Sequence, residues 1–248
     1  MKLTTVGVSG SVPGPDSPGS CYLVQADGFS LVIDLGNGSW GPLQRLIAPD
    51  RIDALLLSHL HADHCADISA LAVHRRYGLA EPPTRALPVW APAGADPRLT
   101  AVSWDTANQL PGVFSVSEMT AGTHRLGPLS VTFSPVAHPV PAFGMRIEHA
   151  GAVLVYTGDS GPCRALEELA VGADVLLAEA GFATHPGNPP DLHLTGADAG
   201  RLAAEAGVRH LVLTHIPPWN SVDEARQEAA RAYEGQITVA TSGWSIEI

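Results

Sequence analysis

The run Ser58-His59-Leu60-His61-Ala62-Asp63-His64 follows directly on the apolar segment 53–57, which has the composition of a buried strand. His59 and His61 alternate at the end of this extended segment, so both imidazoles can point to the same side. Asp63 and His64 follow at the turn into an expected helix. One short loop therefore presents three imidazoles and a carboxylate. Such polar groups are costly beside an apolar strand unless they are satisfied, and this mixture suits zinc and its first-row relatives.

Further metal ligands must come from distant parts of the chain, and three candidates share one context. His138 ends the expected strand 129–137, Asp159 follows the strand 152–156, and His215 follows the strand 210–213. Ligands at the ends of several strands converge on one edge of a sheet, where sites on α/β scaffolds collect. Taken singly, each of the three has an equally good interpretation as a hydrogen-bonded residue without a ligand role.

Composition limits the kinds of partner. The chain has 248 residues, 45% of them hydrophobic and 16% charged, and a formal net charge of −11. That charge argues against a stable nucleic-acid complex or an anionic membrane surface, because both need a basic surface. Three cysteines (Cys21, Cys65 and Cys163) cannot form a complete disulfide set, which fits the reducing cytoplasm. No apolar run approaches the roughly 20 residues of a membrane span. We expect a cytoplasmic enzyme with a small-molecule substrate.

Strand patterns dominate the first third of the chain, and strands alternate with helices thereafter. The expected strands are 3–8, 21–25, 31–34, 53–57, 89–90, 129–137, 143–148, 152–156, 174–179, 210–213 and 237–240. The expected helices are 40–47, 65–77, 97–110, 164–170, 195–206 and 221–233. Thr195 is an expected N-cap, and Ser221 with Glu224 has the spacing of a capping box. Because no long linker divides the sequence, we expect a single domain over 1–248, an α/β fold with two packed sheets and helices outside.

The spacing His-x-His-x-Asp-His resembles the signature of the metallo-β-lactamase superfamily, and the likeness extends to His138, Asp159 and His215. The resemblance implies a four-layer αββα sandwich with two divalent metal ions at one edge of the sheets. It implies Asp159 as the bridging ligand. It also implies Asp34 as a buried aspartate bracing the histidine loop, although a turn aspartate after a strand is an equally good interpretation. The implied ligand groups are His59, His61 and His138 for one metal, and Asp63, His64 and His215 for the other.

A second motif bears on the substrate. His193, in Pro190-Asp191-Leu192-His193-Leu194-Thr195, resembles a His-x-Thr element of the tRNA 3′-processing endonucleases and related cyclic-nucleotide phosphodiesterases. There the histidine acts near the leaving group, and lactamases and glyoxalase-II-type thioesterases lack the element. The alternative is a polar residue flanking a helix. The endonucleases carry a long tRNA-clamping insertion before the bridging aspartate, whereas here Asp159 follows His138 by only 21 positions.

The stretches 10–18, 57–65, 75–77, 189–194 and 213–219 together resemble the actinobacterial atypical class II cyclic-nucleotide phosphodiesterases. This likeness implies hydrolysis of 3′,5′-cyclic AMP. Two metals would lower the pKa of a shared water that attacks phosphorus. Zinc is expected in the first place, and manganese or iron would suit these ligands equally. His193 would act at the departing oxygen, and Asp63 would orient the water. Ser17 and Ser20, in the loop 10–19, are expected near the phosphate, unless that loop is a plain surface connection.

Other functions remain open at this point. A broader phosphodiesterase or short RNA-end nuclease of the RNase Z-like type would use the same chemistry. Lactam or ester hydrolysis fits the metal run but not His193, and a metal-binding sensor would have lost a ligand. The metals, the base preference and the oligomeric state stay undetermined, with the Pro-rich stretch 80–92 a candidate homodimer contact. The remaining histidines are expected to be structural: His74, His124, His149, His185 and His210.

Overall fold

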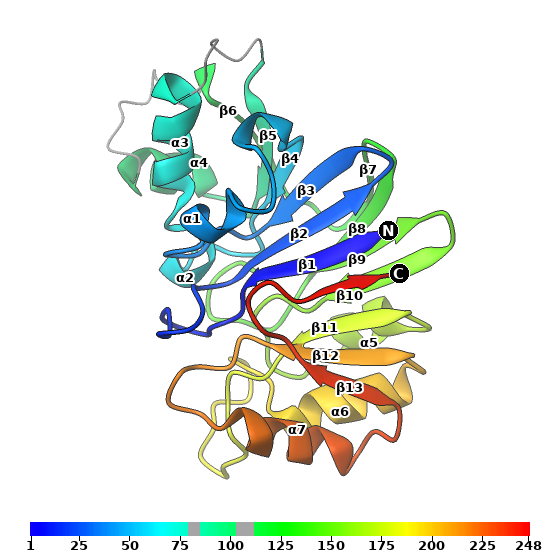
Figure 1. Cartoon of the computed structure of the whole chain (residues 1–248). Helices are drawn as coiled ribbons and strands as arrows, with labels where there is room; N and C mark the ends of the chain where they lie inside the picture. Colours follow the sequence, from blue (N-terminus) through cyan, green and yellow to red (C-terminus); the bar gives the residue numbers. More distant parts are fainter. Residues whose placement is uncertain (79–84, 103–111) are drawn as a thin grey trace.

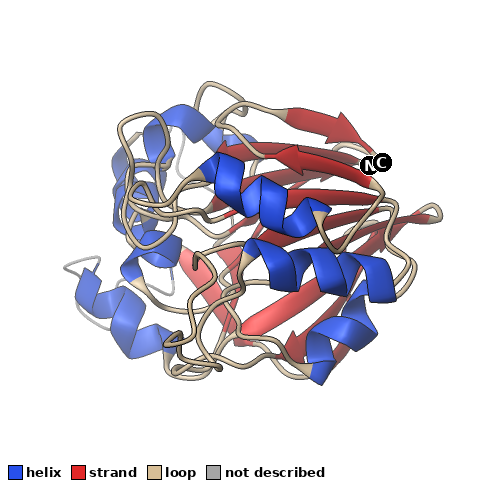
Figure 2. Ribbon diagram, turned by 90° about the horizontal axis from the view of Figure 1, so that it is seen from below, coloured by secondary structure: helices blue, strands red, loops and turns tan. Residues whose placement is uncertain are grey.

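The strands of this chain assemble into two sheets that pack face to face, with helices on both outer faces (Figures 1 and 2). The computed structural model describes residues 1–78, 85–102 and 112–248. Helices α1–α4 lie against one sheet and α5–α7 against the other, as Figure 1 shows from top to bottom. The expected αββα sandwich is confirmed.

The first sheet has the strand order β14-β1-β2-β3-β4-β5-β6, antiparallel from β14 to β3 and parallel from β3 to β6. Parallel strands need long crossovers, and here helices supply them on the outer face. Its strands are β1 (Lys2–Gly7), β2 (Cys21–Ala26), β3 (Phe29–Ile33), β4 (Ala54–Leu56), β5 (Leu87–Ala91), β6 (Phe114–Glu118) and β14 (Ser245–Glu247).

The second sheet repeats this plan in the order β13-β12-β11-β10-β9-β8-β7. Strands β7 to β10 form an antiparallel meander, and β10 to β13 are parallel. Its strands are β7 (Gly122–Leu126), β8 (Leu129–Pro135), β9 (Phe143–His149), β10 (Ala152–Tyr156), β11 (Val175–Glu179), β12 (His210–Thr214) and β13 (Gln236–Val239).

The helices begin where the sequence offers capping side chains. The Thr195 hydroxyl accepts a hydrogen bond from the Asp198 N–H, and the Asp198 carboxylate accepts one from the Thr195 N–H, a capping box that starts α6. Ser221 accepts from the Glu224 N–H at the start of α7. Gly207, past the end of α6, has φ +64°, which favours glycine. The helices are α1 (Trp40–Leu43), α2 (Ala62–Cys65), α3 (Ile68–Tyr77), α4 (Ala95–Val102), α5 (Arg164–Ala170), α6 (Gly196–Glu205) and α7 (Val222–Ala230), with a 3₁₀ turn at Pro49–Arg51. No helix in the described part of the chain is long and apolar enough to cross a membrane.

Alternation along the strands divides the core into layers. In β2, Tyr22 and Val24 face the second sheet, whereas Cys21 and Leu23 face the helices of the first outer layer. In β11, Leu177 faces the inner layer and Leu176 faces α5 and α6. Since both faces of these strands are covered, they read as continuous apolar runs rather than alternating ones.

Several sequence expectations differ from the structure. The helix expected at 65–77 corresponds to α3, which begins at Ile68, and Cys65 instead ends the separate short helix α2. The helix 97–110 corresponds to α4, with its remainder outside the described residues. Strands β6, β7 and β14 were not predicted, because as edge strands they are short and carry polar side chains. In the stretch 80–92, positions 80–84 lie outside the described residues. Leu87, Val89 and Ala91 are buried in β5, so these side chains cannot form a dimer contact.

Candidate metal centre

The predicted ligands all lie beyond the ends of strands, on one edge of the sandwich. The run from Ser58 to His64 follows β4 of the first sheet and extends into α2, which contains Asp63 and His64. In the second sheet, His138 lies beyond β8, Asp159 beyond β10 and His215 beyond β12. The structure therefore brings together seven side chains that are up to 156 positions apart in the sequence.

His59, His61 and His138 form the first group of possible ligands. The His61 Nδ1 atom lies 3.1 Å from His59 Nε2 and 3.3 Å from His138 Nε2. Three nitrogens at such distances cannot all be satisfied by one another. They do match tetrahedral zinc, because two nitrogens each about 2.05 Å from a metal lie about 3.3 Å apart.

Asp63, His64, Asp159 and His215 form the second group, and all four are buried. Asp159 lies between the others, its Oδ1 3.2 Å from His64 Nε2 and its Oδ2 3.2 Å from His215 Nε2. Its Oδ2 is also 3.7 Å from His59 Nε2 in the first group. Asp159 is therefore placed between the two groups.

Unpaired atoms show that this cluster has the properties of a metal site. The His64 Nε2, Asp159 Oδ1 and His215 Nε2 atoms are buried without a hydrogen-bond partner. Burial opposes ionisation of Asp159, but His215, His64 and His59 outweigh it and hold its pKa well below the usual range. Conversely, burial opposes charging of His64, yet Asp159 and Asp34 raise its pKa. The cluster therefore favours positive charge among these atoms, and a divalent cation would supply it.

Asp34 braces the histidine loop through its carboxylate. Its Oδ1 accepts from the Ser58 N–H at 2.7 Å, and its Oδ2 accepts from the Ser58 hydroxyl and the Tyr156 hydroxyl, each at 2.8 Å. The same Oδ2 lies 2.8 Å from His64 Nδ1. This contact leaves His64 Nε2 free to face the cluster, as is usual for histidine ligands.

Two other histidines of the cluster have partners on their far nitrogen. His215 Nδ1 lies 2.9 Å from the Ser20 hydroxyl, and His138 Nδ1 lies 3.0 Å from the Leu192 carbonyl oxygen. Ser20 is fully buried, and its hydroxyl contacts the imidazole of a candidate ligand, His215. The structure thus shows a supporting role for Ser20, and its expected contact with the phosphate stays a prediction.

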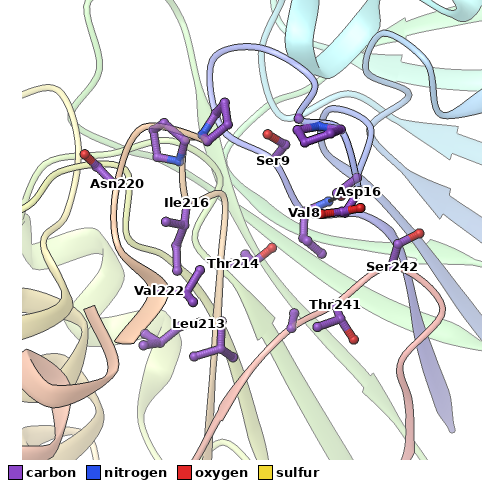
Figure 3. A pocket seen from close by; sticks show the side chains of 17 residues that line it. Val8, Ser9, Asp16, Leu213, Thr214, Ile216, Asn220, Val222, Thr241 and Ser242 are labelled. Carbon is purple, nitrogen blue, oxygen red and sulfur yellow. Dashed lines mark hydrogen bonds between the residues drawn. The ribbon is translucent and has the colours of Figure 1, made fainter. Parts of the chain in front are cut away.

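Ser17 lies in a different place from the one expected. Its hydroxyl accepts from the Val8 N–H and donates to the Pro18 carbonyl, so the loop's own backbone occupies it. The residue lines a cavity of about 290 Å³, shown in Figure 3, together with Thr214 and Ile216. None of the predicted metal ligands lines this cavity. Thr214 and Ile216 flank His215, so the cavity lies on the far side of that ligand's backbone.

His193 joins the cluster through a partner that the sequence analysis missed. Its Nδ1 lies 2.9 Å from Glu179 Oε1, and its ring centroid is 5.8 Å from that of His138 and 5.6 Å from that of His215. Phe182 packs against its other side at 4.9 Å. One sequence signal could have identified Glu179: it is a carboxylate at the end of the apolar strand β11, much as Asp159 and His215 follow the ends of β10 and β12.

Glu179 is fully buried and held by two backbone donors, the Ser160 N–H at 2.9 Å and the Gly181 N–H at 2.8 Å. Burial alone would lower the pKa of His193, but the Glu179 carboxylate outweighs it and raises that pKa to about 9. The Glu179 carboxylate therefore favours the protonated form of His193, with Nδ1–H donating to Glu179.

Other histidines take part in local structure. His149 pairs with Asp27, and His210 lies within hydrogen-bond distance of Thr238. His185 accepts from the Gly187 N–H within its own loop. His74 contacts Trp40, and His124 packs against Trp90.

The family of the chain follows from sequence comparison together with this geometry. The profile of the β-lactamase superfamily domain, Lactamase_B_2, matches residues 30–216. The chain belongs to the metallo-β-lactamase superfamily. Within it, the chain is 44% identical over 254 residues to the uncharacterized protein ML1173 of Mycobacterium leprae (strain TN), covering 100% of this chain and 89% of that relative.

Two further relatives of this superfamily carry descriptive names. The probable metallo-hydrolase YhfI of Bacillus subtilis (strain 168) is 30% identical over 98% of both chains. Its crystal structure superposes with a TM-score of 0.90 over 100% of this chain and 99% of that one, at 29% identity. A ribonuclease Z of Mycolicibacterium gilvum (strain PYR-GCK) is 33% identical, covering 96% of this chain and 93% of the relative. The chain is thus a metallo-hydrolase of the RNase Z-like branch, with a histidine and aspartate cluster that can bind metal.

Proposed function

We propose that this chain is a phosphodiesterase that uses two divalent metal ions, zinc in the first place, to hydrolyse a small cyclic nucleotide, 3′,5′-cyclic AMP above others. The observation that carries the proposal is the pairing of His193 with the buried Glu179 carboxylate beside the candidate metal ligands. A fixed cation beside a metal pair suits a phosphodiester, because negative charge on phosphoryl and departing oxygens must be stabilised.

Under this proposal each metal is held by one of the two ligand groups, with Asp159 between them. When bound, the metals would supply a water of lowered pKa and neutralise charge on the phosphoryl oxygens. Support comes from the distances of 3.1 to 3.8 Å among the candidate ligand atoms and from the buried atoms that lack partners.

The chain's own residues have distinct tasks. His193 keeps Nδ1–H on Glu179, which leaves Nε2–H to donate to a phosphoryl oxygen or to protonate the departing ribose 3′-oxygen. The carboxylate of Asp63, whose pKa is lowered by His64 and His215 against its burial, stays ionised and accepts a hydrogen bond from the attacking water. Phe182 packs edge-on against the His193 ring, with the ring centroids 4.9 Å apart.

Substrate size is inferred from the connection between His138 and Asp159. It consists of β9 and β10, joined by a tight turn at Ala150-Gly151, and has no projecting arm. The net charge of −11 further disfavours a grip on a long polyanion. Both features support a small nucleotide substrate.

The similarity to a ribonuclease Z favours a second candidate, a broader phosphodiesterase or short RNA-end nuclease. Turnover of cyclic AMP, cyclic GMP, 2′,3′-cyclic nucleotides, bis(p-nitrophenyl) phosphate and a short RNA separates the two, with metal content measured on the same sample. We expect the largest kcat/KM for cyclic AMP and two metal ions per chain. A larger kcat/KM for the short RNA would favour the nuclease, and cleavage of a chromogenic cephalosporin alone would refute both.

A further inference from the structure

The candidate ligands of this centre are divided between the two sheets. His59, His61, Asp63 and His64 follow β4 of the first sheet, whereas the other three follow strands of the second sheet. Each ligand group draws on both sheets, since His138 completes the first group and Asp159 and His215 complete the second. A shift of one sheet against the other would therefore distort both groups at once.

Two tyrosine side chains, one from each sheet, reach across to the opposite sheet next to the candidate metal centre. Tyr22 of β2, in the first sheet, places its hydroxyl 2.9 Å from the hydroxyl of Thr214 at the end of β12. Tyr156 of β10, in the second sheet, donates to Asp34 Oδ2 at 2.8 Å, just beyond β3. The two rings are in contact, with centroids 5.0 Å apart. Both side chains are fully buried.

Each of these hydrogen bonds ends at or beside a strained residue of the centre. Asp34 has φ +56°, and His215, which follows Thr214, has φ +55°. A non-glycine residue in such a conformation is strained and persists only where its surroundings determine it. Asp34 in turn holds Ser58 and His64, so Tyr156 acts on the histidine run from the opposite sheet.

We infer that Tyr22 and Tyr156 form a cross-sheet clamp, a pair of positioning residues that hold the two halves of the ligand set at the separation a metal pair requires. Their rings fill the core between the sheets, and phenylalanine would fill it equally well. The hydroxyl groups fix how the two sheets lie against each other, because a buried hydrogen bond has a preferred geometry and apolar contact has none. This inference rests on the two-metal part of the proposed function and is independent of the substrate.

The test compares Tyr22→Phe, Tyr156→Phe and the double variant with Tyr233→Phe. Tyr233 is a matched control, because its hydroxyl also makes a buried hydrogen bond, 2.8 Å to the Val208 carbonyl, but in the outer helical layer. Zinc affinity is measured by competition with a chromophoric chelator. The magnetic coupling between two Mn²⁺ ions, read by electron paramagnetic resonance, reports their separation without reference to turnover.

We expect each clamp variant to lose about 10- to 100-fold in affinity for at least one zinc ion, the usual effect of removing a partner behind the ligands. The coupling between the Mn²⁺ ions should change as well. Tyr233→Phe should lower the melting temperature of the apoprotein and leave affinity and coupling as in the unaltered chain. Thr214→Val removes the Tyr22 bond from its other end, so it should reproduce Tyr22→Phe and replaces it if that variant does not fold.

Unchanged affinity and coupling in the clamp variants would overturn the inference, whatever happens to the melting temperature. An equal loss of affinity in Tyr233→Phe would also overturn it, because the effect would then follow from general destabilisation. If the unaltered chain binds fewer than two metal ions, the proposed function fails first, and the clamp fails with it. If it binds two ions without turning over cyclic AMP, only the substrate assignment is wrong.

Discussion

Replacing Glu179 by glutamine removes one buried negative charge while keeping the shape of the side chain. In the structure this carboxylate accepts from His193 Nδ1 at 2.9 Å and raises the pKa of that imidazole to about 9. Without this charge, burial and His64 lower the pKa of His193 and only Asp159 raises it, so the pKa should fall toward the ordinary value of about 6.5. The variant therefore deprotonates the proposed general acid within the neutral range.

The size of the effect follows from protonation alone. At pH 8 a group with a pKa of about 9 is about 90% protonated, whereas one with a pKa of about 6.5 is about 3% protonated. The loss of turnover should be roughly 30-fold at pH 8 and less than about twofold at pH 6. Bound metal ions would lower both pKa values through their positive charge, but the difference that Glu179 causes would persist.

The assay is kcat for cyclic AMP between pH 5.5 and 9.5, in the unaltered chain and in Glu179→Gln, with metal content and melting temperature measured on both. Glu228→Gln is the control, since its carboxylate accepts from the Thr184 N–H and does not contact His193. The basic limb of the pH profile should move to lower pH in Glu179→Gln alone. A loss of turnover that is the same at pH 6 and pH 8 would refute the reasoning, and Glu179 would then be only structural.

Four further results are expected. His193→Ala should keep the full metal content and lose about 10²–10⁴ in turnover, the range for a general acid, and undiminished activity would exclude that role. Asp159→Ala should reduce metal content below two ions per chain, since this carboxylate lies between both ligand groups. Ser20→Ala should weaken zinc affinity about 10- to 100-fold, as measured by chelator competition, because His215 Nδ1 loses its partner. Removing metal with a chelator should lower the melting temperature, and zinc should restore it, because the cluster otherwise buries unpaired polar atoms; an unchanged melting temperature would show that the folded chain binds no metal.

Local sequence patterns predicted most helices and strands, because capping side chains and hydrophobic periodicity act over a few neighbouring residues. The capping side chains Thr195 and Ser221 start their helices as expected, and the helix 164–170 has the predicted bounds. The edge strands β6, β7 and β14 were missed, because what defines them is pairing with a neighbouring strand and not a hydrophobic pattern. That neighbour is the next strand in the chain for β7, but it is distant in the sequence for β14.

The candidate site was predictable to the extent that its residues share a local context. His138, Asp159 and His215 each follow a strand, so sequence placed them at one sheet edge, and the structure brings them together there. Glu179 follows the same rule but belongs to no recognisable motif. The contact of Ser20 with His215 could not be predicted, because a loop sequence does not show which of its side chains face the ligands and which support them from behind.

The sequence by itself determined that this chain has a histidine and aspartate cluster, because four of its members lie within six residues directly after a buried strand, where so many polar groups are costly unless they are satisfied. Only the tertiary structure decided how that cluster is supported. Glu179 meets His193 across 14 positions, and Tyr156 meets Asp34 across 122. Such contacts arise when two sheets pack and strand ends align, and this alignment depends on the whole core rather than on any segment of the chain.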